Sequence, residues 1–248
     1  MKFFAKSDIG TIREENQDSY GISELQGEYL LAVVCDGMGG MAGGKIAAKT
    51  AVKTYLERFG FFYSERKAQS DVIKAFDIKR IFSNAVYSAN IAVCERSAEE
   101  KLSGMGTTLT SAMIYGSTLY TANVGDSRTY LIHKNEITQL TRDDSYVQEL
   151  LDRGVIDEHE ARIHPRKNLI TKALGASADI EPEYNCALLE QGDVVLLCSD
   201  GLTNALTDSD ILAIVNGDGD FEEKLSRLID ASNEKNGDDN VTAVLIKI

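Results

Sequence analysis

The chain has 248 residues, of which 43% are hydrophobic and 26% charged, and its formal net charge is −13. This length suits one large domain or two small ones with an ample core, and the negative charge argues against a nucleic acid or an anionic membrane as the main partner. The sequence has no apolar run of membrane-spanning length, no signal peptide, and no C-x-x-C pair among its four cysteines. A cytoplasmic protein without a structural zinc site is therefore expected.

The N-terminal part of the chain combines short strands with two long helical segments. Strands are expected over residues 2–7, 19–25 and 29–35. A turn at Gln26 and Gly27 would join the last two strands as a hairpin. The hydrophobic stripe of the first helical segment ends at Gly60, which predicts a helix C-cap there. A second long helix is expected over about residues 72–102.

The remainder of the chain groups its strands and helices in blocks. Strand patterns cover residues 107–114, 117–124, 128–133 and 136–140, which predicts an antiparallel meander. The segment 141–174 is helical and charged. Further strands are expected over 186–189, 193–198 and 241–248, and helices over 208–216 and 221–233. Because strand blocks and helix blocks are segregated, the sequence predicts the α+β fold class.

Three acidic residues stand where expected buried strands begin or end. Asp36 follows the continuous apolar run 29–35. Asp200 follows a second such run, and Asp239 comes just before the last strand. Since neighbouring antiparallel strands place the end of one beside the start of the next, these acids can converge at one edge of a sheet. Three converging carboxylates need cations to offset their repulsion, and an oxygen-only ligand set favours Mg²⁺ or Mn²⁺ over zinc.

Seven short motifs are distributed over nearly the whole length of the chain. In chain order they are Gly10-x-x-Arg13-x-x-Asn16-Gln17-Asp18, Asp36-Gly37-Met38-Gly39-Gly40, Gly104-Met105-Gly106-Thr107-Thr108, Asn123-Val124-Gly125-Asp126-Ser127-Arg128, Leu169-Ile170-Thr171-Lys172-Ala173-Leu174-Gly175, Ser199-Asp200-Gly201-Leu202 and Asp238-Asp239-Asn240-Val241-Thr242. Each motif is weak alone, but together and in this order they resemble those of the bacterial protein phosphatase 2C-like family of metal-dependent serine/threonine phosphatases. The resemblance implies a β-sandwich of two antiparallel sheets flanked by pairs of α-helices. It also implies a single domain over residues 1–248, with a flap at about 141–174.

The resemblance further implies roles for individual residues. Asp36 would bridge two metal ions, Mn²⁺ or Mg²⁺, and the Gly37 carbonyl would help to hold one of them. Asp200 and Asp239 would hold the other ion. Asp126 would bind a third, looser ion together with Asp200.

Two more residues would act beside the ions. Arg13 would clamp the substrate phosphate with its planar guanidinium, and Asp18 would act on the ions through water molecules. Members of the family often have a histidine where this chain has Met38, Met41 or Asp144. The resemblance therefore does not identify the group that protonates the leaving oxygen.

Several residues also have an ordinary structural interpretation. Arg13 is compatible with a surface arginine in a polar loop, and Asp126 with a residue that caps a turn. The run Arg142-Asp143-Asp144 is interpreted as solvated charge. The segment 217–220 superficially resembles a calcium loop, but it lacks the later ligands and is interpreted as a helix-capping loop.

The function implied by the resemblance is metal-dependent hydrolysis of phosphoserine and phosphothreonine in proteins. A water that bridges two ions would attack phosphorus in line. The enzyme would act as a monomer on phosphorylated proteins and oppose a cognate serine/threonine kinase. Two alternatives stay open: a non-catalytic, phosphatase-like regulatory module and a metal-dependent hydrolase of small phosphoesters.

Overall fold

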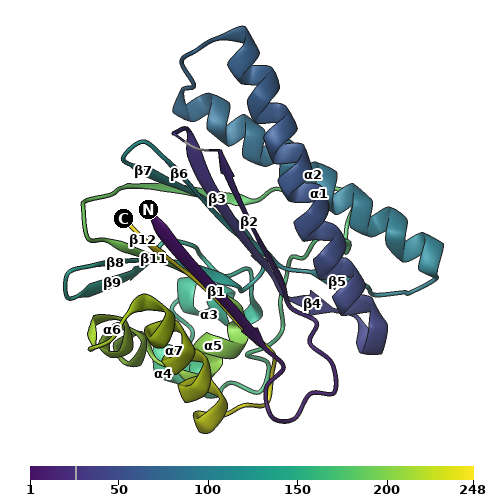
Figure 1. Ribbon diagram of the computed structural model, residues 1–248. Coiled ribbons are helices and arrows are strands. Elements are labelled where there is room, and N and C mark those ends of the chain that lie inside the picture. The colour runs from purple at the N-terminus through teal and green to yellow at the C-terminus, as the bar shows by residue number, and fades with distance from the viewer. Residues whose placement is uncertain (26) are drawn as a thin grey trace.

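Two five-stranded antiparallel sheets face each other at the centre of the molecule (Figure 1). The computed structural model describes residues 1–25 and 27–248, apart from the side chains of Met41 and Ala42. The strands of one sheet, in spatial order, are β1 (Lys2–Asp8), β12 (Val241–Lys247), β11 (Val194–Cys198), β8 (Arg128–His133) and β9 (Glu136–Gln139). Those of the other are β10 (Glu183–Leu188), β7 (Thr118–Val124), β6 (Leu109–Tyr115), β3 (Tyr29–Cys35) and β2 (Ser19–Leu25). The predicted α+β sandwich is confirmed.

Helices cover the outer face of each sheet (Figure 1). The sheet that contains β3 is covered by α1 (Gly40–Gln69) and α2 (Ala75–Glu100), and the other sheet by α5 (Asp200–Ala205), α6 (Asp208–Asn216) and α7 (Phe221–Lys235). The predicted C-cap at Gly60 is wrong because α1 continues through it. The buried stripe resumes beyond it, with Phe59 and Tyr63 both packed in the core under α1.

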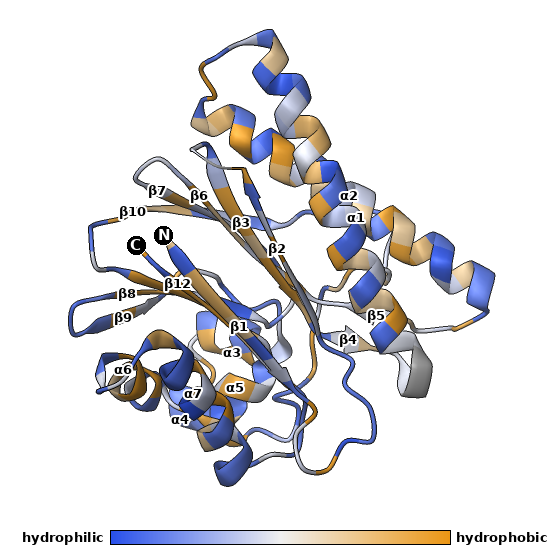
Figure 2. Cartoon of the chain, in the orientation of Figure 1, coloured by the Kyte–Doolittle hydropathy of each residue, from blue (hydrophilic) through white to orange (hydrophobic). Residues whose placement is uncertain are grey.

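Three apolar layers hold the sandwich together, and β3 contributes to two of them. Leu30, Ala32 and Val34 face the opposite sheet. Leu31, Val33 and Cys35 face α1 and α2. This placement explains the continuous apolar run of this strand, because both of its faces are buried. In Figure 2 the strands are mostly orange, whereas the loop between β1 and β2 is largely blue.

The predicted four-strand meander is wrong because the chain changes sheet at residues 125–127. The hairpin of β6 and β7 belongs to one sheet, and the hairpin of β8 and β9 belongs to the other. A strand, a glycine turn and a second strand form the same local pattern in a hairpin and in a sheet crossing. The crossing places Asp126 between the two sheets, which no hairpin turn would do.

Smaller elements complete the fold around the ends of the central strands. They are β4 (Gly37–Met38), β5 (Gly106–Thr107), α3 (Tyr146–Asp152) and α4 (Glu158–Ile163). The segment 217–220 ends in Asp220, whose side chain caps α7 by accepting a hydrogen bond from the Glu223 amide, so the capping interpretation is confirmed. The expected turn residue Gln26 lies outside the described residues, as does the side chain of Met41.

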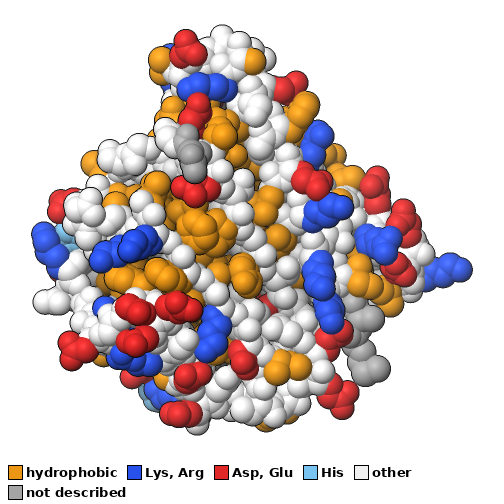
Figure 3. Space-filling view, viewed as in Figure 1, with side chains coloured by type: hydrophobic (Ala, Val, Ile, Leu, Met, Phe, Trp, Pro, Cys, Tyr) orange, Lys and Arg blue, Asp and Glu red, His pale blue; other side chains and the backbone are white. Residues whose placement is uncertain are grey.

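The edges of both sheets expose hydrophobic side chains. β1 presents Phe3, and β2 presents Tyr20 and Leu25, each 39–45% exposed. Figure 3 shows hydrophobic side chains gathered across the middle of this face, with charged side chains around them. Over the described residues, no helix has both the length and the hydrophobicity needed to cross a bilayer.

Candidate active site

A cavity of about 1010 Å³ opens where strands of both sheets end, and aspartates from four separate segments line it. These are Asp36, Asp126, Asp200 and Asp239. Gly37 and Arg13 line the same cavity. The structure thus brings together six of the residues singled out in the sequence, which lie up to 226 positions apart along the chain. The seventh, Asp18, lies behind the cavity wall and is 7% exposed.

The backbone of Asp36 is fixed by three hydrogen bonds to Thr107 and Thr108. Its amide donates to Thr108 Oγ1 at 2.9 Å, and its carbonyl accepts from the Thr108 amide at 2.9 Å. Thr107 Oγ1 also donates to this carbonyl at 2.8 Å. Gly37 then pairs with Thr107 in the short ladder of β4 and β5. These contacts leave the Asp36 carboxylate directed by a rigid backbone.

Gly37 occupies a position where a side chain has no room. A Cβ on this residue would lie against the carbonyl of Gly44, near the N-terminus of α1. The close approach of these two backbone segments requires glycine. Gly37 itself lines the cavity.

Asp200 and Asp18 form the buried side of the site. Asn204, one turn further along α5, donates to Asp200 Oδ2 at 2.8 Å. Ser199 Oγ donates to Asp18 Oδ2 at 2.7 Å. Because Ser199 directly precedes Asp200, this hydrogen bond connects the two aspartates. The second oxygen of each carboxylate, Oδ1, is buried and has no hydrogen-bond partner. Such oxygens are costly to bury and need either a proton or a cation.

Asp239 is directed toward Arg13 at the open side of the cavity. Arg13 Nη2 lies 2.8 Å from Asp239 Oδ2, and Arg13 Nε donates to the Asp238 carbonyl at 3.2 Å. The amide of Asn240 donates to Asp239 Oδ1 at 2.8 Å. Both charged side chains remain partly exposed, at 52% for Arg13 and 27% for Asp239. The arginine is therefore an ordered residue of the site and not a free surface side chain.

Asn240 anchors the loop that carries Arg13. Its Nδ2 donates to the carbonyls of Ile9 and Glu15 at 2.9 and 3.1 Å. Its Oδ1 accepts from the Gln17 amide at 2.8 Å. The sequence motif contained Asn240, but its spacing did not reveal this role, because the contacts join segments more than 220 residues apart.

Burial and mutual repulsion raise the pKa values of the clustered acids. Burial raises the pKa of Asp36 well above its ordinary value, and the charges of Asp18, Asp200 and Asp126 raise it further. Burial likewise raises the pKa of Asp126, and the charge of Asp200 raises it further. The pKa of Asp200 is raised by burial and by Asp239. The site therefore disfavours four free carboxylates and favours cations among them.

The residues present fit divalent cations that bind oxygen. Two buried carboxylate oxygens without a hydrogen-bond partner, Asp18 Oδ1 and Asp200 Oδ1, belong to this cluster, and the cavity lining contains no histidine or cysteine among the described residues. In the described part of the chain, no three acidic, histidine or cysteine side chains are already arranged to hold an ion by themselves. This arrangement suits Mg²⁺ or Mn²⁺, which keep several water ligands and need few carboxylates, better than it suits zinc.

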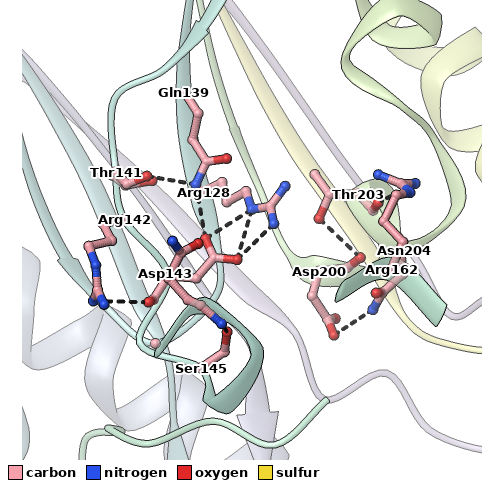
Figure 4. Close-up of polar contacts among 12 residues, drawn as sticks. Arg128, Gln139, Thr141, Arg142, Asp143, Ser145, Arg162, Asp200, Thr203 and Asn204 are labelled. Atoms are coloured by element: carbon pink, nitrogen blue, oxygen red, sulfur yellow. Dashed lines mark hydrogen bonds and ion pairs between the residues drawn. The ribbon is translucent and has the colours of Figure 1, made fainter. Parts of the chain in front are cut away.

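The entry of the 141–174 segment is bound to the turn that carries Asp126 (Figure 4). Asp143 pairs with Arg128 through contacts of 2.7–3.1 Å, and Gln139 Nε2 donates to Asp143 at 3.0 Å. Asp144 accepts from the Gly125 amide through its carboxylate at 3.2 Å. Both aspartates are buried, at 5% and 7% exposure. Their interpretation as solvated charge is wrong, because a local run of charges does not reveal which partners the fold provides.

Comparisons with known proteins agree with this geometry. A family model described as protein phosphatase 2C matches residues 13–246. The serine/threonine phosphatase stp of Listeria welshimeri is 35% identical over 243 residues, which cover 98% of this chain and 94% of that protein. A solved serine/threonine phosphatase of S. agalactiae superposes with a TM-score of 0.88 at 32% identity and covers 100% of this chain and 99% of that one. The PstP catalytic domain, solved with two manganese ions, gives a TM-score of 0.81 at 33% identity, with 98% and 96% covered.

Proposed function

The chain belongs to the protein phosphatase 2C family of metal-dependent serine/threonine phosphatases, and on this premise we propose how its acidic cavity performs the reaction. The observation that carries the proposal is the convergence of four carboxylates and Arg13 on one cavity. Neither a purely regulatory module nor a hydrolase of small phosphoesters is favoured, since every acid of the family motifs is present and the relatives are protein phosphatases.

The acids divide into three tasks. Asp36 and the Gly37 carbonyl would hold one core ion, and Asp36, Asp200 and Asp239 would hold the second. Asp126 and Asp200 would hold a third, weaker ion. When bound, divalent ions supply an acidified water and neutralise the phosphoryl oxygens. Asp18 acts behind this set, since Ser199 ties it to the backbone beside Asp200.

Arg13 is the side chain that contacts the substrate phosphate directly. Its guanidinium is 52% exposed at the mouth of the cavity, within reach of an incoming phosphate. A planar guanidinium binds two phosphate oxygens at once and so orients phosphorus toward the attacking water. In the reaction, the oxygen of an in-line water would bond to phosphorus as the bond to the serine or threonine oxygen breaks on the opposite side, and a proton lost by the water would leave with that oxygen. The carboxylates contribute by fixing charge and position rather than by covalent chemistry.

The organisation around the site follows the family pattern. Residues 1–248 act as one phosphatase domain, with the segment 141–174 as a flap beside the cavity. The protein acts as a monomer in the cytoplasm, and its substrates are phosphoproteins made by a cognate serine/threonine kinase. The contacts of Asp143 and Asp144 with the Asp126 turn support the placement of the flap.

A metal titration with a phosphothreonine peptide tests the proposal. Phosphate release is expected to require Mn²⁺ or Mg²⁺, and Asp239→Ala is expected to abolish it at low metal concentration. The matched control is Asp230→Ala, which removes an acidic side chain that is 64% exposed and is not part of the cavity lining. Release that persists after chelation and in Asp239→Ala would contradict the proposed function.

A further inference from the structure

The mouth of the cavity holds a large apolar side chain in water. Ile12 is 68% exposed although its loop is fixed on both sides. The backbone amide and the hydroxyl of Thr11 both donate to the Gly237 carbonyl at 2.8 Å. On the other side, Arg13 is bound to Asp238 and Asp239. The loop thus presents Ile12 in a defined position, where its apolar surface contributes nothing to the core.

Three further apolar residues line the same cavity from different segments. They are Ile9 from the start of this loop, Met38 from β4, and Ile170 from the end of the 141–174 segment. Ile170 is held there by backbone pairing with Ser145. A single exposed isoleucine is common on protein surfaces, but several apolar side chains around one polar cavity mark a binding surface.

The charges at the mouth restrict what can bind beside these apolar residues. Among the described residues, the lining contains six acids and two cations: Glu14, Glu15, Asp36, Asp126, Asp200 and Asp239 against Arg13 and Lys45. Lys45 is already paired with Glu15 at 2.6 Å. Acidic groups next to a substrate phosphate would therefore meet Glu14 and Glu15 without a free cation to offset them.

We propose that the cavity selects phosphopeptides that carry an apolar side chain within two residues of the phosphorylated residue, with Ile12 as the main contact, and that it disfavours acidic neighbours. The inference rests on the proposed function of the same site. Ile12 is adjacent to Arg13, and both residues line the same cavity. A peptide whose phosphate is held by Arg13 therefore passes close to Ile12.

Matched phosphothreonine peptides test this selection. One position at a time, from two residues before to two residues after the phosphothreonine, is changed to Leu, Ser or Glu. At one of these positions kcat/KM is expected to follow the order Leu, Ser, Glu, with about a tenfold advantage of Leu over Ser. Ile12→Ser is expected to reduce this advantage to nearly one, whereas Ile12→Leu should retain it.

The control is Leu188→Ser on β10, which alters a side chain that is 77% exposed and outside the cavity lining. This variant should keep the full Leu-to-Ser ratio. Equal hydrolysis of all the peptides by the unaltered protein would overturn the selection while leaving the phosphatase intact. An unchanged ratio in Ile12→Ser would overturn the role of Ile12. Failure to hydrolyse any peptide with Mn²⁺ present would overturn the proposed function and this inference together.

Discussion

The guanidinium of Arg13 lies 2.8 Å from the carboxylate of Asp239. This contact pairs the proposed phosphate clamp with a proposed metal ligand. Because both side chains are partly exposed, at 52% and 27%, the pair is screened by water and worth little in stability. Arg13 can therefore leave Asp239 to bind the substrate phosphate, and Asp239 can leave Arg13 to bind a metal ion, each at a small cost in free energy. Substitutions of Arg13 should accordingly affect metal binding and substrate binding in opposite directions.

Arg13→Ala is expected to lower kcat/KM on a phosphothreonine peptide by about 10- to 100-fold, the usual value of a charged hydrogen-bonding contact. The same change should tighten Mn²⁺ binding, because it removes a positive charge beside Asp239. Steady-state kinetics at saturating Mn²⁺ and calorimetric titration of the metal measure the two effects. Arg13→Lys serves as the control, since it keeps the charge but loses the planar fork. Weaker Mn²⁺ binding in Arg13→Ala would contradict the opposed effects.

The metal-free protein should lose stability as the pH rises from about 4 to about 7. Burial, together with the charges of Asp200 and Asp239, raises the pKa of Asp18 from 3.8 to about 7 in the folded state. The folded protein thus binds this proton more tightly than the unfolded chain, so folding is favoured at low pH and the advantage disappears toward pH 7. Burial raises the pKa of Asp36 and Asp126 in the same direction.

Thermal unfolding in the presence of a chelator measures this trend. The midpoint should be higher at pH 5.5 than at pH 8, and Asp18→Asn should flatten the dependence. The acids whose pKa is lowered by their partners, Asp77, Asp152 and Asp210, act below pH 3.8 and so outside this window. A midpoint that rises with pH over this range would refute the assignment.

Asp143→Ala should destabilise the protein by about 3 kcal/mol, because it leaves the largely buried Arg128 without a carboxylate and with only the Tyr130 hydroxyl as a side-chain partner. The Asp143 side chain is 7% exposed and that of Arg128 is 24% exposed. Asp152→Ala is the matched control, since it removes the acid of the Arg142–Asp152 pair, whose side chains are 44% and 43% exposed. This change should cost less than about 1 kcal/mol. Urea unfolding measures the free energy of unfolding of both variants. Equal losses of stability would contradict the buried role of Asp143.

Two glycine substitutions should have opposite effects. Gly60→Ala should stabilise the fold by about 0.5–1 kcal/mol, because alanine favours a helix interior and the added Cβ meets only the Tyr29 hydroxyl at 3.8 Å. Gly10→Ala should destabilise, since Gly10 has φ of +80° and its Cβ would lie against the Asp239 carbonyl. Thermal unfolding measures both, and weaker Mn²⁺ binding is expected in Gly10→Ala alone.

The sequence predicts those parts of the fold in which local pattern and tertiary role agree. The apolar run before Asp36 is a strand with both faces buried. The helix expected over 208–216 has the predicted bounds. The acids at positions 36, 200 and 239 reach one cavity. In each case the signal is a strand end or a hydrophobic period that the surrounding fold does not override.

Other features depend on contacts that no local pattern contains. The change of sheet after Val124, the passage of α1 through Gly60 and the burial of Asp143 each follow from tertiary packing rather than from the local sequence. Helix α5 was also missed, because its six residues are too short for a hydrophobic period. Pairwise signals between distant positions would have been needed to find them.

The proposed ligands come from opposite halves of the sandwich: Asp36 extends one sheet, whereas Asp200 and Asp239 extend the other. Their spacing is therefore set by the thickness of the hydrophobic filling between the sheets, which includes Val34, Leu197 and Val244. A bulkier side chain in that filling would separate the carboxylates, and a smaller one would let them approach. Core residues that do not contact an ion thereby determine how well the aspartates at the strand ends can bind one.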